Sequence, residues 1–338
     1  MQPSSFEIRI KGKSFMVPSV QVDGHTVIAT GKWVKTARVH DEEWTSGQIV
    51  KAPADFIARM KEQGLRADVF TFAQKVPDSE PKYPGYYEMD NFAVVPLTTY
   101  EEWWEKRIPQ ESRKNVRRAG RRGVTVKAVE LDDELIRGIT EIYNETPIRQ
   151  GVPFGHYGKN FDTVKKEAST LMDRSEFIGA YFQNELIGFI KLVYMGNLSS
   201  VLHIVSFNRH YDKRPTNALL AKAVEISIQR GKSFLIYGKY IYGNKSDSSL
   251  TEFKHRNGFE KMVFPQYYMP LTIKGRIFLK LGFHRGLLGM LPPGMITVLI
   301  NLRAWLVKKI VLPLRAAPKP GKSTPNVAPA LEQDEAAG

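Results

Sequence analysis

The helix between two apolar, strand-like stretches, at residues 200–207 and 234–240, constrains the fold more than any other feature of the chain. Pro215 suits the first turn of this helix, and Gly231 ends it. Strands that are joined through a helix pair in parallel, because the helix returns the chain to the same end of the sheet. The sequence therefore predicts a sheet with a parallel pair and a crossover helix.

The elements around this unit follow a distinctive order, which periodicity and turn residues indicate. They are a strand at 124–129, helices at 132–144 and 161–174, strands at 177–182, 186–194 and 200–207, the crossover helix, a strand at 234–240, a short helix at 248–256 and a strand at 260–271. The order β-α-α-β-β-β-α-β-α-β predicts a mixed α+β or α/β fold, in which helices flank a twisted sheet.

Residues 1–98 predict a β-rich N-terminal portion. Asp23-Gly24 is a strong hairpin signal, and Pro53 opens a short amphipathic helix that Gly64 ends. Strands are expected at 6–10, 67–76 and 86–97. Two helices, broken at Pro109, then lead into a core domain at 99–271.

The C-terminal part differs in character. Residues 272–315 carry basic and large apolar side chains, including Trp305, and no acidic residue. This pattern fits an amphipathic region on an anionic membrane surface and equally fits helices docked on the domain. Residues 316–338 are rich in Ala, Pro, Gly and Lys and predict a disordered tail. No apolar run reaches the length of a membrane span, and no secretory signal opens the chain.

Composition excludes several kinds of site. The chain has no cysteine, so disulfides, Cys–zinc sites and a cysteine nucleophile are ruled out, and a reducing compartment fits. The 7 histidines form no His-x-x-x-His pair, and no metal site is predicted. A net charge of +14 favours an anionic partner: a nucleotide-like donor, a nucleic acid or a membrane surface. We expect a cytoplasmic protein, with the inner face of the membrane as a second location.

Four short motifs in the core domain carry a family resemblance. They are Arg113 to Val124, Pro215-Thr216-Asn217-Ala218-Leu219-Leu220, Leu235-Ile236-Tyr237-Gly238, and Phe253-Lys254 with Asn257-Gly258-Phe259. In order and spacing they resemble the GNAT acyltransferases, and among these the branch of the Fem-type peptidoglycan aminoacyltransferases. The resemblance implies a GNAT-like fold, and residues 1–98 as a reduced second unit. It also implies no permanently bound cofactor, with acyl-CoA, acyl carrier protein or aminoacyl-tRNA as donor substrate.

One departure concerns the turn before the crossover helix. GNAT proteins that bind coenzyme A have glycines here, whose amides cradle a pyrophosphate, whereas this chain has Arg214 and Thr216. The cradle is therefore in doubt. Lys213 and Arg214 can still supply positive charge to a donor anion at this helix N-terminus, and the resemblance gives the donor-binding candidates as Lys213, Arg214, Thr216 and Asn217.

The catalytic candidates lie in the last two motifs. Lys254 is expected to steady an oxyanion or hold a phosphate. The alternative is a solvated helix lysine. Tyr237 and Tyr240, with Tyr242 nearby, are expected to return a proton to the leaving group. The alternative is a set of packed strand aromatics.

The acceptor candidates lie in two loops. Arg149, Gln150, His156 and Tyr157 belong to a Gly-rich loop at 149–159, which resembles an acceptor-binding lid. Lys239 and Asn244 follow a core strand. His203 is either a buried structural histidine or a general base, and Glu88 and Asp90 are further candidates for the base.

These features predict an acyltransferase that moves an acyl or aminoacyl group from a thioester or ester to an amine or hydroxyl, with transfer to nitrogen favoured. A cell-envelope or lipid precursor is the expected acceptor. Two alternatives stay open: a nucleic-acid-binding protein that uses the basic helix 111–122, and a non-catalytic ligand-binding protein. The chain has no Walker, dinucleotide or Gly-x-Ser-x-Gly motif, so oxidoreductase and hydrolase classes have little support.

Overall fold

The computed structural model describes residues 2–10, 13–42, 47–149, 152–242 and 249–285. All of them belong to one compact unit, Met1–Leu291. Most of the predicted basic region and the predicted tail therefore lie outside the described residues. Among the described residues, no helix combines the length and the apolar character that a membrane crossing needs. Within the same ranges, no three His, Asp or Glu side chains gather as metal ligands would.

A sheet of twelve strands organises this unit. Its spatial order is β1 (Ser4–Ile10), β2 (Lys13–Val22), β3 (His25–Thr30), β4 (Thr36–Val39), β5 (Val69–Ala73), β14 (Glu260–Pro270), β6 (Tyr86–Pro96), β13 (Phe234–Ile236), β12 (Leu198–Ser206), β11 (Glu185–Met195), β10 (Ser175–Phe182) and β7 (Thr125–Val129). The predicted fold class, a mixed sheet flanked by helices with a β-rich N-terminal portion, is confirmed. A small separate hairpin joins β8 (Ile148–Arg149) to β9 (Val152–Pro153).

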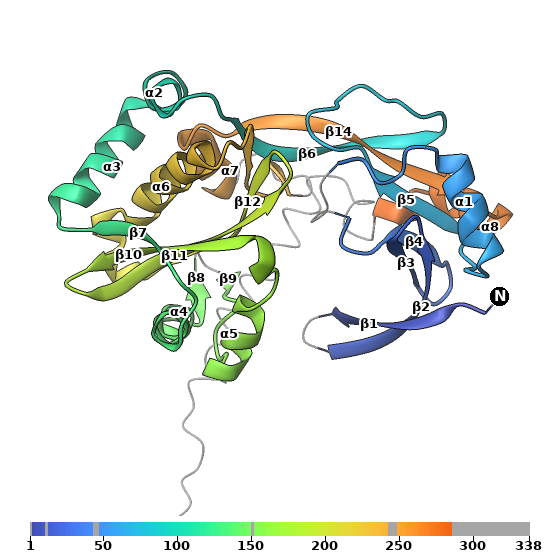
Figure 1. The fold of residues 1–338 in the computed structure, drawn as a ribbon, viewed down its shortest axis with the longest axis horizontal. Coiled ribbons are helices and arrows are strands. Elements are labelled where there is room, and N and C mark those ends of the chain that lie inside the picture. The colour runs from blue at the N-terminus through green and yellow to red at the C-terminus, as the bar shows by residue number, and fades with distance from the viewer. Residues whose placement is uncertain (1, 11–12, 43–46, 150–151, 243–248, 286–338) are drawn as a thin grey trace, which may run out of the picture. The chain divides into compact units, whose positions relative to one another are not determined.

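Helices cover both faces of the strands from β7 to β12. In Figure 1, α3 and α6 lie on one face, and α4 and α5 lie on the other. The α-helices are α1 (Pro53–Glu62), α2 (Tyr100–Glu102), α3 (Gln110–Arg121), α4 (Asp133–Asn144), α5 (Phe161–Ala168), α6 (Pro215–Gln229), α7 (Ser249–Arg256) and α8 (Ile273–Lys280). A π-helical turn, Trp103–Arg107, follows α2, and short 3-10 turns lie at Met172–Arg174, Asn208–Lys213 and Phe283–Arg285.

The parallel pair around the crossover helix is confirmed but short. β12 and β13 pair only from Leu198–Ser200 to Phe234–Ile236. After Ile236 the chain turns to β6 instead: the amide of Tyr237 donates to Ala93 O at 2.9 Å, and the amide of Ala93 donates to Gly238 O at 2.8 Å. The strand predicted at 234–240 is therefore too long, and beyond Ser200 β12 no longer pairs with β13.

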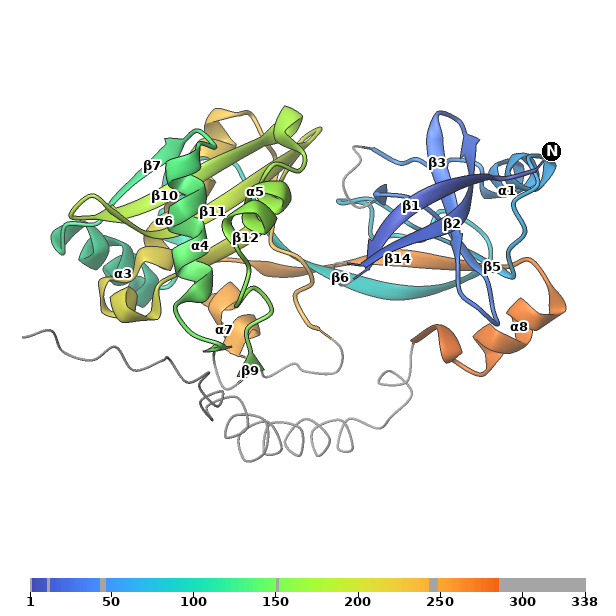
Figure 2. The ribbon, with the colours of Figure 1, turned by 90° about the horizontal axis from the view of Figure 1, so that it is seen from below.

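Two strands link the N-terminal portion to the core domain. β14 pairs with both β5 and β6, and β6 pairs with β13. In both views β6 and β14 lie side by side (Figures 1 and 2). The sheet thus crosses residue 98, where the sequence predicts a boundary, and the division into domains stays a prediction.

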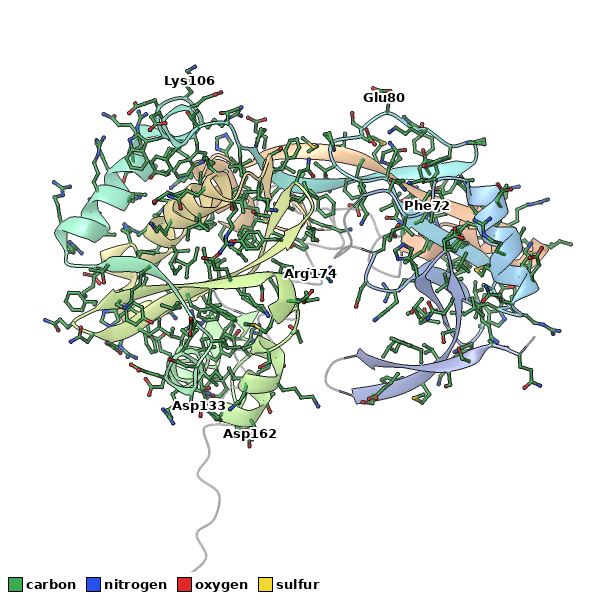
Figure 3. All side chains as sticks on the ribbon, in the orientation of Figure 1. Phe72, Glu80, Lys106, Asp133, Asp162 and Arg174 are labelled. Atoms are coloured by element: carbon green, nitrogen blue, oxygen red, sulfur yellow. The ribbon has the colours of Figure 1, made fainter. Side chains whose placement is uncertain are left out.

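Apolar side chains form a core beneath each set of helices. In the core domain α6 buries Leu219, Leu220 and Ala223 against β11 residues such as Phe189. In the N-terminal portion, stacked rings of Phe56, Phe70, Phe72 and Tyr267 fill the space under α1. Figure 3 shows Phe72 inside this portion, whereas Lys106, Asp133 and Asp162 lie at the surface. These cores fix the positions of the strand ends that carry the site.

Two further differences from the sequence have local causes. The helix predicted at 161–174 ends at Ala168, because Lys191 Nζ donates to the carbonyl oxygens of Ala168, at 2.7 Å, and of Thr170. Leu171 then adopts a left-handed conformation, with φ 56°. The four-residue β4 was not predicted. The hairpin at Asp23-Gly24 is confirmed, since Val22 pairs with His25.

Candidate functional site

Lys254 on α7 is fully buried and has no carboxylate partner among the described residues. Its Nζ donates to Lys239 O at 2.6 Å and lies 4.7 Å from the ring centre of Tyr237 and 4.8 Å from that of Tyr242. Burial lowers the pKa of Lys254 to about 8. A carbonyl and two aromatic faces hold this ammonium without neutralising its charge.

The Asn-Gly-Phe motif fixes Lys254 in place. Gly258, with φ 81°, ends α7, and the amides of Asn257 and Phe259 both donate to Lys254 O, at 3.0 and 3.1 Å. A Cβ on Gly258 would lie 3.0 Å from a methyl group of Ile108, so the close packing also favours glycine. These contacts thus fix the C-terminus of α7 against the core, and they fix Lys254 with it.

A side-chain pair connects this helix end to the start of α6. Asn217 Nδ2 donates to Asn257 Oδ1 at 3.1 Å, and Asn257, only 4% exposed, donates in turn to Phe253 O at 2.7 Å. Two predicted site residues, Asn217 and Lys254, are therefore brought together by Asn257, which belongs to a motif quoted above but was not predicted as a site residue.

The predicted tyrosines surround Lys254 unequally. Tyr237 packs against Phe259, and burial raises its pKa. Burial also raises the pKa of Tyr240, which is half-buried. Tyr242 is half-exposed, and its hydroxyl occupies the space that a Cβ on Gly238 would need. The structure thus places Tyr237 and Tyr242 at the ammonium, whereas no contact of the Tyr240 side chain with Lys254 is seen in the described ranges.

The turn before α6 carries the predicted donor-binding residues. Arg214 adopts a left-handed conformation, φ 57° and ψ 39°, where related turns have glycine. Its guanidinium lies 4.9 Å from the ring of Tyr211, and its Nε is buried without a partner among the described residues. Lys213 Nζ lies 4.7 Å from the ring of Phe182, and Thr216 Oγ1 lies 3.1 Å from Ser206 Oγ. Both cations are thus positioned by aromatic rings.

A carboxylate already occupies the amides nearest the end of β12. Glu145, at the end of α4, accepts from the amides of Asn208 and Arg209, at 2.7 and 2.9 Å. A phosphate cradle needs such amides to be free. Glu145, a residue that sequence reasoning missed, thus closes these two amides, which precede the turn at Arg214, to an anionic ligand.

The lid segment, residues 149–159, is anchored to β12. Arg149 donates to Ser206 O at 2.7 Å and to Ile142 O at 2.9 Å, and it pairs with Glu145 at 3.2 Å. The structure gives Arg149 an anchoring position. His156 stacks on Tyr143, with ring centres 4.3 Å apart, and Tyr157 is half-exposed. Gln150 lies outside the described residues.

Lys239 lies at a different opening. Its Nζ pairs with Asp90 at 2.6 Å, and both side chains line a cavity of about 420 Å³. The walls also include Arg38, Gln266 and Tyr268. Lys239 thus links the two places, since its side chain lines this cavity and its carbonyl oxygen accepts from Lys254. Asn244 lies outside the described residues.

The two carboxylates proposed as bases are both engaged. Asp90 pairs with Lys239, as described. Glu88 accepts from Tyr86 at 2.6 Å, and from His284 and Arg285 at 2.8 Å each. These donors outweigh the effect of burial and lower the pKa of Glu88 to about 2. A carboxylate that accepts hydrogen bonds from three side chains and has so low a pKa is a poor proton acceptor.

Comparison with solved structures defines the fold. FemX matches with a TM-score of 0.55 and 12% identity, over 82% of this chain and 90% of FemX. The chain shares the fold of FemX.

Two lysylphosphatidylglycerol synthetase structures match less well. The C-terminal domain of the putative enzyme from Agrobacterium fabrum gives a TM-score of 0.49 and 12% identity, over 78% of this chain and 87% of that domain. L-PGS from Bacillus licheniformis gives a TM-score of 0.49 and 13% identity, over 79% of this chain and 88% of L-PGS. No family model matches the sequence. No curated protein matches it either.

Within the Fem-type fold, the candidate residues lie on two sides of the sheet. Lys254, Asn217 and Arg214 belong to α7 and the start of α6, which we name the donor side. The lid segment belongs with α4 and α5 on the opposite face, which we name the acceptor side (Figure 1). Among the described residues, the edge of β12 that faces β13 has no pairing partner beyond Ser200, between these two sides.

Proposed function

We propose that this protein is an acyltransferase that moves an acyl or aminoacyl group from a thioester or ester donor to an amine. The observation that carries the proposal is Lys254, a buried ammonium without a carboxylate partner in the described residues. Attack on a carbonyl concentrates negative charge on its oxygen, and a fixed cation in a water-poor site stabilises this charge. The Fem-type fold supports the assignment.

Each side of the sheet has a role in this proposal. The acceptor nitrogen attacks the donor carbonyl, Lys254 stabilises the oxyanion, and the carbon–sulfur or carbon–oxygen bond then breaks. Tyr242 or Tyr237 returns a proton to the leaving group. Lys213 and Arg214 bind the anionic part of the donor. The lid segment, Lys239 and the neighbouring cavity bind the acceptor.

The donor is the finer part of the proposal. Acyl-CoA, acyl carrier protein and aminoacyl-tRNA are the candidates. Arg214 and Thr216 stand where the coenzyme A cradle has glycines, and this departure ranks coenzyme A below the other two donors. The resemblance to Fem-type aminoacyltransferases directs the acceptor to a cell-envelope or lipid precursor. A cytoplasmic location at the inner membrane face rests only on the basic composition of 272–315.

A donor screen tests this function. Full-length protein is incubated with coenzyme A, acyl-CoAs, acylated carrier protein or aminoacyl-tRNA, and the melting temperature and any transfer to an amine are measured. We expect at least one donor to stabilise the protein and to be consumed, and Lys254→Met to abolish consumption. If no donor changes the melting temperature and none is consumed, the proposal fails.

Nucleic-acid binding is a second candidate, and one surface favours it. Lys114, Arg118 and Arg121 line one stripe of α3 and form no ion pair or side-chain hydrogen bond within the described ranges. The affinity for transfer RNA and for a DNA duplex is measured against salt concentration. Replacing all three residues by Gln would lower the salt slope by about 2–3 if each contacts a phosphate. Tight binding together with absent transfer would favour this candidate over the enzyme.

A further inference from the structure

His203 on β12 combines features that a packed structural histidine does not need. It lies on the stretch of β12 beyond Ser200, where pairing with β13 has ended. Neither of its ring nitrogens has a hydrogen-bond partner in the part of the chain that the structure describes, and neither is sealed from solvent. Its imidazole is thus free to accept a proton.

The backbone is irregular next to this residue. His203 pairs with Lys191, but the next pair is Val201 with Leu192, so Leu202 is an extra residue in β12. Such a bulge re-aims the neighbouring side chains and is common beside active sites. The strand therefore departs from regular geometry at the point where it leaves β13.

The side chain of His203 lies on the acceptor side. Its ring meets the ring of His156, from the lid segment, edge to face, with centres 5.5 Å apart. His156 is held by stacking on Tyr143 and by Lys159, whose Nζ lies 3.0 Å from His156 Nδ1. His156 of the lid segment thus lies against His203.

The segment that follows β13 leads to the proposed oxyanion site. β12 and β13 are paired up to Ser200 and Ile236, and His203 and Lys239 lie on the two segments that continue from these residues. Lys239 supplies the carbonyl that holds Lys254. The two segments therefore carry the imidazole and the carbonyl that holds the ammonium.

We propose that His203 is the general base that deprotonates the acyl acceptor, which approaches from the acceptor side beside His156. This inference rests on the proposed transferase function. Once the nitrogen–carbon bond has formed, a nitrogen–hydrogen bond of the resulting ammonium breaks and its proton moves to the imidazole. The bond to the leaving sulfur or oxygen then breaks, and the leaving group takes a proton from Tyr242 or Tyr237. The imidazole releases its proton to solvent and the tyrosine regains one from solvent, so both groups are regenerated and no oxidant or reductant is needed.

The charges around His203 suit this role. His156, Lys191 and Lys159 oppose a positive charge on the ring, and Glu167, which pairs with Lys159 at 2.5 Å, favours one. Together with burial, the larger effect, they lower the pKa of His203 to about 4. The ring is therefore neutral at pH 7. A base this weak takes a proton readily from the acidic ammonium of a tetrahedral intermediate, and much less readily from a hydroxyl.

Chemical modification tests the availability of His203. Full-length protein is treated with diethyl pyrocarbonate near neutral pH, and modified histidines are located by mass spectrometry. We expect His203 to react, as exposed His255 does. His284, 3% exposed and bonded to Glu88, serves as the unreactive control. A His203 as unreactive as His284 would overturn the proposal.

Transfer kinetics test its role. With a donor from the screen, His203→Gln should lower turnover to a primary amine by about 10²–10⁴-fold, at unchanged donor affinity. Transfer to hydroxylamine, a strong nucleophile that is largely unprotonated at neutral pH, should fall much less. His255→Gln is the matched control. Equal turnover of His203→Gln and the unaltered protein would overturn this inference alone, whereas no turnover by the unaltered protein with any donor would overturn the proposed function and the inference with it.

Discussion

Lys254 Nζ donates to the carbonyl oxygen of Lys239 at 2.6 Å, although the two residues belong to different elements and neither offers the other a countercharge. A buried ammonium without a carboxylate partner destabilises a folded protein. In the proposed function this cost is offset only during the reaction, when an oxyanion forms at the ammonium.

Replacing Lys254 by Met keeps the volume of the side chain and removes its charge. We expect turnover to fall by about 10²–10³-fold while donor affinity changes little, because the charge acts on the transition state. In the unaltered protein, activity should also fall as the pH rises through about 8, where Lys254 loses its proton. Lys261→Met, at an exposed position of β14, is the control. Unchanged turnover in Lys254→Met would remove Lys254 from the mechanism.

Stability should rise with pH in the same range. Lys191 and Lys254 are both fully buried, and burial lowers both pKa values to about 8, from 10.5 in an unfolded chain. Between these values the unfolded state binds more protons, so deprotonation favours the folded state. From pH 7 to about pH 9.5 we expect each lysine to add about 1–2 kcal/mol to the free energy of unfolding.

Urea unfolding at several pH values measures this effect. Lys191→Met should flatten the rise by roughly half. A free energy of unfolding that falls over this range would show that the two ammonium groups are better solvated than their burial indicates.

The sequence predicted the order of elements because that order follows from patterns within single segments. The hairpin at Asp23-Gly24 and the crossover helix after Pro215 are local signals, and both are confirmed. The early end of the strand at Ile236 is not local, since it depends on hydrogen bonds to Ala93. For the same reason the short α5 could not be foreseen, because the lysine that ends it lies on another strand.

The site was predicted unevenly. Motif residues Lys254, Asn217 and Tyr237 do come together. Glu145 was missed, because nothing in the sequence distinguishes a glutamate that binds distant amides from any other glutamate at a helix end. Lys191 had a signal: it is a single charge within the apolar run from Leu186 to Val193. A lysine in such a run needs buried carbonyl oxygens as hydrogen-bond partners. The sequence pattern could therefore have predicted a contact of this kind for Lys191.

Arg214→Gly separates backbone strain from ligand binding. Glycine adopts the left-handed conformation without a Cβ penalty, so we expect thermal stability to stay equal or to rise by up to about 1 kcal/mol. Affinity for an anionic donor should fall, because the guanidinium beside Tyr211 is lost. Calorimetry and donor titration measure the two effects separately. A large loss of stability would instead show that Arg214 serves mainly as a packing residue.

Arg149→Lys should loosen the lid segment without unfolding the core. Lysine cannot reach Ser206 O, Ile142 O and Glu145 at once, as the guanidinium does. We expect a loss of about 1–3 kcal/mol of local stability. Hydrogen exchange should quicken at the lid segment and at Asn208 and Arg209, and stay slow in α6. Uniformly faster exchange would contradict a local anchoring role.

The sharing of β6 and β14 has a consequence for truncation. β13 obtains one neighbour from β12 and the other from β6, a strand that precedes residue 98. A fragment that began at residue 99 would expose unpaired amides and carbonyls along β13 and β14, next to Tyr237 and Lys239. Open edges of this kind recruit strands from other molecules. The N-terminal portion therefore protects the core domain from aggregation, whatever it contributes to binding.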